Sequence, residues 1–157
     1  MFRSCGIRLS HFEMYTAESL SDVFMYMIDL FGENPKTCDL KGIVYDRSCD
    51  LHPFIQRLSK EGNHAAQNYQ KLNFIVDIFH VEKHTLSKCV LGSDNCMYHP
   101  HLPKFNDVKK MNTEIAEQSF SRINMFKYSS RKMNYYKRLL FLKFIDDSAN
   151  DQVLKKR

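Results

Sequence analysis

Two acidic residues that lie far apart in the sequence could together hold divalent metal ions. Asp46 closes the apolar stretch 42–46, and Glu117 lies in a predicted helix at 112–127. Two carboxylates can bind cations that activate a water molecule and stabilise a leaving oxygen during phosphoryl transfer. Glu117 falls near the edge of that helix's apolar stripe and Glu114 almost opposite it, which favours Glu117. Ordinary surface carboxylates are the alternative interpretation.

A segment rich in His and Cys, residues 80–111, offers ligands for a zinc ion. His80 and His84 are four residues apart, so one helical turn would aim both imidazoles at one ion. A long loop in a compact domain generally needs something that ties it down. His99 and His101 offer substitute ligands, and polar loop residues with a buried thiol or two are the alternative. The tetrahedral set that we expect is His80, His84, Cys89 and Cys96.

The elements that must position these residues alternate between strand and helix. Alternation and helical spacing predict strands at 5–14, 43–46 and 74–77, and helices at 18–31, 50–58, 65–72 and 112–127. Short apolar strands joined by helices pair in parallel, so we expect an α/β layer. Segment 135–145 is apolar nearly all round, which is typical of a buried helix or of one at an interface. From Asp146 onward we expect the chain to fray.

Composition places the chain among folded proteins of an intracellular type. It has 157 residues, of which 43% are apolar, enough for one domain with a core. No apolar run is long enough to span a membrane, and the first residues lack the apolar core of a signal peptide. The five cysteines, an odd number, argue against a disulfide framework. We therefore expect a nuclear or cytoplasmic protein with reduced thiols.

Positive charge is concentrated in the second half of the chain. Residues 1–103 hold 10 Lys/Arg and 12 Asp/Glu, a net charge of −2, whereas residues 104–143 hold 10 and 3, a net charge of +7. A basic region of this kind suggests an anionic partner, most simply nucleic acid. An ordinary solvated face is the alternative, and charge alone favours that alternative.

Three ordered blocks of the sequence resemble KDZ (Kyakuja, Dileera and Zisupton) transposases. Residues 44–51 resemble the family's YD-x-x-C segment, residues 74–89 its D-x-F-H-x-x-x-H block, and residues 112–118 its N-x-x-x-x-E-Q block. The segments that precede the first block are similar as well, so the resemblance covers residues 5 to 145.

The resemblance implies an RNase H-like catalytic core of the DDE type, which cleaves and joins DNA strands with Mg²⁺. It makes Asp46 the second acid, at the end of the fourth strand, and Glu117 the acid on the later helix. His80, His84 and Cys89 match the family's His/Cys block, for which the resemblance implies zinc binding. The family's first catalytic Asp lies on an earlier strand, upstream of anything that matches here.

We therefore expect an incomplete RNase H-like domain over residues 1–147, with a short mixed or parallel sheet flanked by helices. The His/Cys-rich insert 80–111 and a C-terminal helical region would belong to it, and residues 148–157 would form a polar tail. The chain looks like the C-terminal part of a transposase, and without the third acid we expect it to be inactive alone.

DNA is the expected partner, no membrane is expected, and we leave homo-oligomerisation open. The alternative function is that of a zinc-stabilised module that binds nucleic acid or protein without catalysis. A third interpretation is the product of a decayed element, with no function. The cations that we expect to contact phosphates are Lys104, Lys109, Lys110, Arg122, Lys127, Arg131 and Lys132.

Overall fold

The chain divides into two units, each of which is described by itself. The mixed unit spans Phe12–Lys110, and the helical unit joins Met1–His11 to Met111–Arg157. The structure, a computed structural model, describes residues 9, 19–77, 80, 96–100, 102–105, 121 and 124–155. The strand predicted at 5–14 and most of the helix predicted at 112–127 lie outside the described residues.

The first described helix of the mixed unit is α1, Leu20–Phe31, which confirms the helix predicted at 18–31. The side chain of Ser19 caps its first turn by accepting a hydrogen bond from the backbone N–H of Asp22 at 3.1 Å. Gly32 follows the last turn with φ at 75°, a conformation that favours glycine. The face of α1 turned to the core carries the buried residues Val23, Phe24 and Met27.

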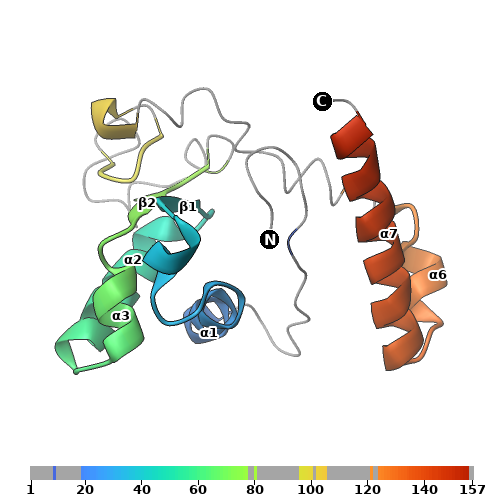
Figure 1. Ribbon diagram of the computed structural model, residues 1–157, viewed down its shortest axis with the longest axis horizontal. Helices are drawn as coiled ribbons and strands as arrows, with labels where there is room; N and C mark the ends of the chain where they lie inside the picture. Colours follow the sequence, from blue (N-terminus) through green and yellow to red (C-terminus); the bar gives the residue numbers. More distant parts are fainter. Residues whose placement is uncertain are drawn as a thin grey trace. The chain divides into compact units, whose positions relative to one another are not determined.

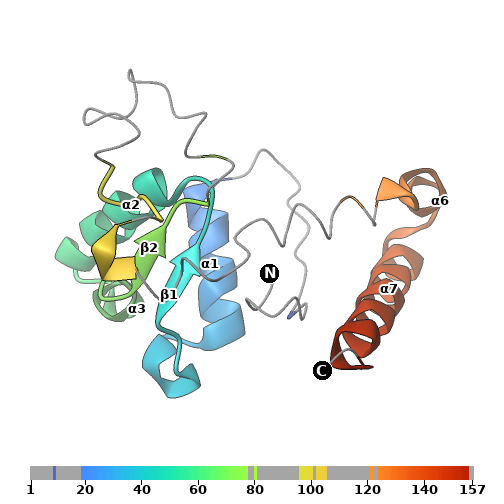
Figure 2. The same ribbon diagram turned by 90° about the horizontal axis from the view of Figure 1, so that it is seen from above.

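Two strands pair in parallel, as the sequence predicts. β1 spans Gly42–Val44 and β2 spans Asn73–Ile75, and the register aligns Val44 with Ile75. A Cβ atom at Gly42 would lie 2.8 Å from the carbonyl oxygen of Asn73, so glycine is required for this close approach. Figure 2 shows the two strands side by side and pointing the same way. Among the described residues the sheet contains only this pair.

The helices α1, α2 and α3 gather on one side of the strands (Figure 1). α2 spans Ser48–Lys60 and α3 spans His64–Tyr69, and α2 contacts α1, α3 and β2. Asn63 caps α3 through a hydrogen bond from the backbone N–H of Ala66 to its side-chain oxygen, at 2.9 Å. The short 3-10 turns η1, Pro35–Cys38, and η2, Pro103–Phe105, complete the unit as described.

Tyr69 connects α3 to the end of α1 inside the core. Its ring is fully buried and packs edge-on against Phe24 with ring centroids 5.4 Å apart. Its hydroxyl lies 2.9 Å from the carbonyl oxygen of Met27 and 2.8 Å from that of Gly32, so its single hydrogen is shared between two helix-end acceptors. Burial raises the pKa of Tyr69 to about 12, which keeps the hydroxyl protonated as a donor.

Residues 96–100 and 102–105, the docked segment, lie beside β2 on the side away from β1. The backbone N–H of Val76 donates to the carbonyl oxygen of Tyr98 at 2.9 Å. His52 on α2 stacks on Phe74, with ring centroids 4.7 Å apart, and its Nδ1 lies 3.3 Å from the Tyr98 hydroxyl. Its Nε2 lies 3.1 Å from the carbonyl oxygen of Gln70. His52 is therefore the side chain that joins α2, β2 and the docked segment.

The helical unit, as far as it is described, contains α6, Lys127–Arg131, and α7, Tyr135–Lys155. The expectation that the chain frays from Asp146 is wrong, because α7 continues to Lys155. This second half is polar and contains several Asp, Asn and Ser residues, and Lys143 and Asp147 form an exposed i,i+4 ion pair at 4.0 Å. Segment 135–145 is helical, and since none of the described residues of α7 is buried, only the interface alternative stays a prediction for it.

The described residues thus form a mixed α/β unit and a helical region, which confirms the coarse fold class. Within those residues, no helix is both long enough and apolar enough to cross a membrane. The RNase H-like arrangement of a larger sheet stays a prediction.

The position of His52 predicts that acidification destabilises the mixed unit. The pKa of His52 is lowered, mainly because burial removes water from the charged ring. The nearby positive charge of Lys104 also lowers this pKa, whereas the hydrogen bond to the carbonyl of Gln70 raises it. A lowered pKa means that folding favours the neutral ring, so this stability is present above the unfolded pKa of about 6.5 and is lost as the pH falls through the folded value.

We expect the free energy of urea unfolding to fall more between pH 7.5 and pH 5 in the wild type than in His52→Gln, which has no imidazole at this place. The difference between the two proteins cancels the contribution of the other histidines. An equal loss in both proteins would show that His52 does not govern the acid sensitivity.

Candidate functional site at the carboxyl edge of the sheet

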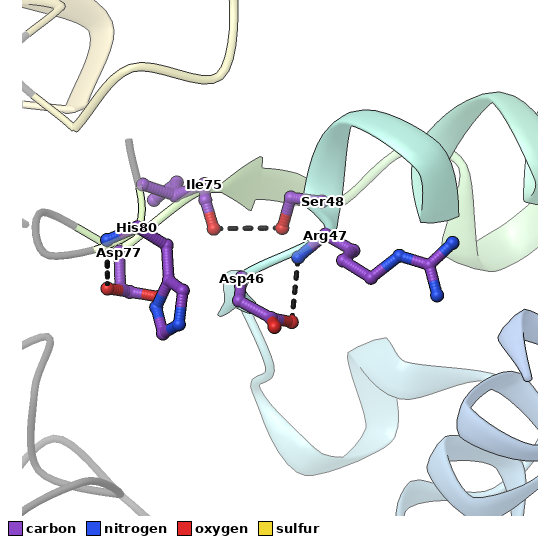
Figure 3. Close-up of polar contacts among 6 residues, drawn as sticks. All are labelled: Asp46, Arg47, Ser48, Ile75, Asp77 and His80. Atoms are coloured by element: carbon purple, nitrogen blue, oxygen red, sulfur yellow. Dashed lines mark hydrogen bonds and ion pairs between the residues drawn. The ribbon is translucent and has the colours of Figure 1, made fainter. Parts of the chain in front are cut away.

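Two acidic residues follow the paired strands at equivalent positions. Asp46 comes two residues after Val44, the last residue of β1, and Asp77 comes two residues after Ile75, the last residue of β2. Because the register aligns Val44 with Ile75 and the strands are parallel, both acids lie at the carboxyl edge of the sheet. Figure 3 shows their side chains at this edge, with His80 beside Asp77.

The carbonyl oxygen of Ile75 fixes the turn that carries Asp46. It accepts a hydrogen bond from the backbone N–H of Tyr45 at 3.0 Å and a second from the Oγ of Ser48 at 2.8 Å. Ser48 is fully buried at the first position of α2. The end of β1 and the start of α2 are therefore both held to β2, and the intervening Asp46 has little freedom to move away from the edge.

The carboxylate of Asp46 is available to a cation. One of its oxygens accepts a hydrogen bond from the backbone N–H of Arg47 at 2.8 Å. The guanidinium of Arg47 points away from it (Figure 3), and its Nε lies 3.0 Å from an oxygen of Asp50. That hydrogen bond is the main reason that the pKa of Arg47 is raised. Within the described part of the chain, Asp46 forms no ion pair, and its carboxylate keeps lone pairs for a ligand.

Asp77 has a different task, because both of its oxygens are engaged by His80. The backbone N–H of His80 donates to Oδ1 at 3.0 Å, and its Nδ1 lies 2.7 Å from Oδ2. Asp77 is only 7% exposed. A carboxylate can only accept, so Nδ1 carries the proton, and in the neutral ring Nε2 is the nitrogen with the lone pair. Asp77 therefore sets the orientation and the tautomer of His80.

Asp77 is not among the site residues predicted from the sequence. Two features of the sequence could have indicated a role for Asp77. Its place after β2 repeats that of Asp46 after β1, and the i,i+3 spacing to His80 lets one turn of chain bring a carboxylate to an imidazole. Neither feature indicates which oxygen or nitrogen is used, because that depends on how the chain turns after the strand.

The remaining predicted metal ligands are only partly described. Cys96 is 2% exposed, and the backbone beside it docks on β2 through Tyr98. No group of three or more His, Cys, Asp or Glu that could hold a metal ion is found where the structure is described. The predicted ligands outside that part are Glu117, its rival Glu114, His84 and Cys89.

The predicted phosphate-binding cations belong to both units. Lys104 is exposed in η2 of the mixed unit, with its Nζ 4.6 Å from the ring centroid of Phe105. In the helical unit, α6 begins at Lys127 and ends at Arg131, and Lys132 follows it. All three side chains are exposed. Lys109, Lys110 and Arg122 lie outside the described residues. The contact of these cations with nucleic acid stays a prediction.

The hydrogen bonds of Asp77 predict the tautomer of His80. At a pH where the ring is neutral, long-range ¹H–¹⁵N NMR spectra should show the proton of His80 on Nδ1. Asp77→Ala removes both acceptors, so we expect a mixture of tautomers in that variant. Asp46→Asn, a change at the same edge, should leave the His80 signals as they are. A wild-type ring protonated on Nε2 would contradict the assignment even if Asp77→Ala failed to fold.

Comparisons with known proteins give one match. No curated protein and no solved structure matches the chain. The family model described as Kyakuja-Dileera-Zisupton transposase matches residues 3–150, which is nearly the whole chain and includes the edge that carries Asp46, Asp77 and His80. The chain therefore belongs to the KDZ transposase family.

Proposed function

We propose that this transposon-derived chain carries part of the metal site of a transposase that cleaves and joins DNA strands, with Asp46 as one ligand of a divalent metal ion. The family is one of transposases, so DNA is the implied partner. The observation that carries the proposal is the place of Asp46, which is held at the carboxyl edge by the Ile75 carbonyl and is not neutralised by Arg47. Ligand sites of parallel sheets lie at such an edge.

The donors at this edge fit a hard cation such as Mg²⁺, which prefers carboxylate oxygens. Asp46 would be one ligand. Asp77 is not the second, because His80 engages both of its oxygens. The second ligand would be Glu117, on the predicted helix 112–127, with Glu114 as the rival. When bound, the metal would activate a nucleophile and stabilise the leaving oxygen. Asp46 would hold it in place, and exposed cations such as Lys127 and Arg131 would contact phosphates.

Titration with Mn²⁺ tests the metal site directly. Carboxylate sites that suit Mg²⁺ also bind Mn²⁺, whose unpaired electrons broaden nearby NMR signals. We expect selective broadening of the amide signals of residues 45–48 and 76–77, and we expect Asp46→Asn to abolish it. Asp50→Asn is the matched control, because Asp50 lies on the next turn and pairs with Arg47. Broadening that persists in Asp46→Asn, or its absence at millimolar Mn²⁺, would refute the proposal.

A zinc-stabilised binding module is the second candidate function. It is favoured by the Asp77–His80 pair, because a carboxylate commonly orients a histidine that ligates a metal through its other nitrogen. It is also favoured by Cys96, whose thiol is buried in the docked segment. The set would be completed by His84 and Cys89, and it would tie the insert 80–111 to the sheet.

Zinc analysis of the purified protein distinguishes the two functions. The module predicts one zinc per chain, and this zinc should be lost in His84→Ala and in Cys96→Ser. His64→Ala is the control, because His64 is exposed and faces Glu33. One bound zinc without Asp46-dependent Mn²⁺ binding would support the module, and a protein that purifies and folds without zinc would contradict it.

A further inference from the structure

One face of α7 carries an exposed apolar stripe. Tyr136, Leu140 and Phe144 are spaced by four residues, so they share a face, and they are 76%, 69% and 71% exposed. Leu154, which is 55% exposed, extends the stripe toward the end of the helix. Three large apolar side chains in a row, with a fourth farther along the same face, are typical of an interaction surface rather than of an isolated surface residue.

Charged residues line this stripe in an asymmetric order. Exposed Lys137 and Lys143 flank its first half, and exposed Asp147 and Asp151 continue the same face in its second half. No acidic residue occurs between 124 and 145, whereas three occur between 146 and 151. The face is therefore positive in its first half and negative at Asp147 and Asp151, and Lys155 follows at the end of the helix.

We propose that the stripe of α7 pairs with the same stripe of a second copy, with the two helices antiparallel. A two-fold pair that crosses near Phe144 brings the basic half of each helix against the acidic half of the other. Lys143 then faces Asp147 of the second copy and Tyr136 faces its Leu154, so the surface is complementary to itself in both charge and apolar contact. A parallel pair would place like charges opposite each other.

Other occupants fit this face less well. A nucleic acid or an anionic lipid surface would meet Asp147 and Asp151, which repel phosphate groups. The ion pair between Lys143 and Asp147 within one chain does not compete strongly, because both side chains are well exposed and their nitrogen–oxygen distance is 4.0 Å. The same charges can therefore pair between copies. This interface does not depend on the metal site or on DNA binding.

Sedimentation velocity of the full chain, freed of nucleic acid, tests the pairing from ~1 μM to ~1 mM, the range in which a small interface dissociates. We expect a monomer–dimer equilibrium. Phe144→Glu places two carboxylates at the crossing point and should weaken the dimer at least about tenfold. Met125→Glu adds the same charge at a site of the helical unit that is 74% exposed, and it should leave the equilibrium unchanged.

Charge reversal tests the antiparallel register. Lys143→Glu alone and Asp147→Lys alone each place like charges opposite each other, so each should weaken the dimer. The double variant restores opposite charges and should recover the affinity. Circular dichroism controls for helix content. A wild-type chain that stays monomeric over the whole range, or association that Phe144→Glu does not weaken, would overturn the proposal.

Discussion

The carbonyl oxygen of Ile75 is the point on which the geometry of the candidate site depends. It accepts hydrogen bonds from the backbone of Tyr45 and from the buried hydroxyl of Ser48. Each such bond contributes about 1 kcal/mol net, and removing a buried partner costs more because the other group is left unsatisfied. These two bonds hold the end of β1 and the start of α2 to the end of β2. Asp46 lies between the end of β1 and the start of α2, so its position depends on theirs.

The layer beneath the strands supports this arrangement. Leu51 and Ile55 of α2 are fully buried in the core. Tyr69 of α3 donates a hydrogen bond to the end of α1. His52 adds a polar contact in the same layer, because its two ring nitrogens lie near Tyr98 and the carbonyl of Gln70. The helix that carries Ser48 is thus fixed from several sides, and the edge that carries Asp46 and Asp77 rests on a packed base rather than on a free loop.

Local patterns in the sequence predict most of the elements in the described part of the mixed unit. The spacing of Leu20, Phe24 and Met27 indicates α1, and the short apolar runs before Asp46 and Asp77 indicate a parallel pair, because helices separate them. These features were predictable because each depends on residues close in sequence. The alignment of Val44 with Ile75, and hence the pairing of the two acids, depends on tertiary contacts that no local pattern encodes.

Two features of α7 depend on more than local polarity. The polar residues after Asp146 indicate fraying, but α7 continues through them to Lys155. The apolar character of 135–145 fits either a buried helix or one at an interface, and the stripe from Tyr136 to Phe144 is exposed. An apolar helix face indicates packing against another surface, and it does not indicate whether that surface belongs to the same chain.

Separate features have separate roles: Asp77 orients His80, and we propose that Asp46 binds a metal ion and that the stripe of α7 pairs with a second copy. The proposed function depends first on the binding of a divalent metal ion by Asp46. A crystal structure of the protein with Mn²⁺, read through the anomalous signal of the metal, tests this most directly. We expect a Mn²⁺ ion bound by the Asp46 carboxylate, and a structure at millimolar Mn²⁺ that holds no ion at Asp46 would refute the proposal.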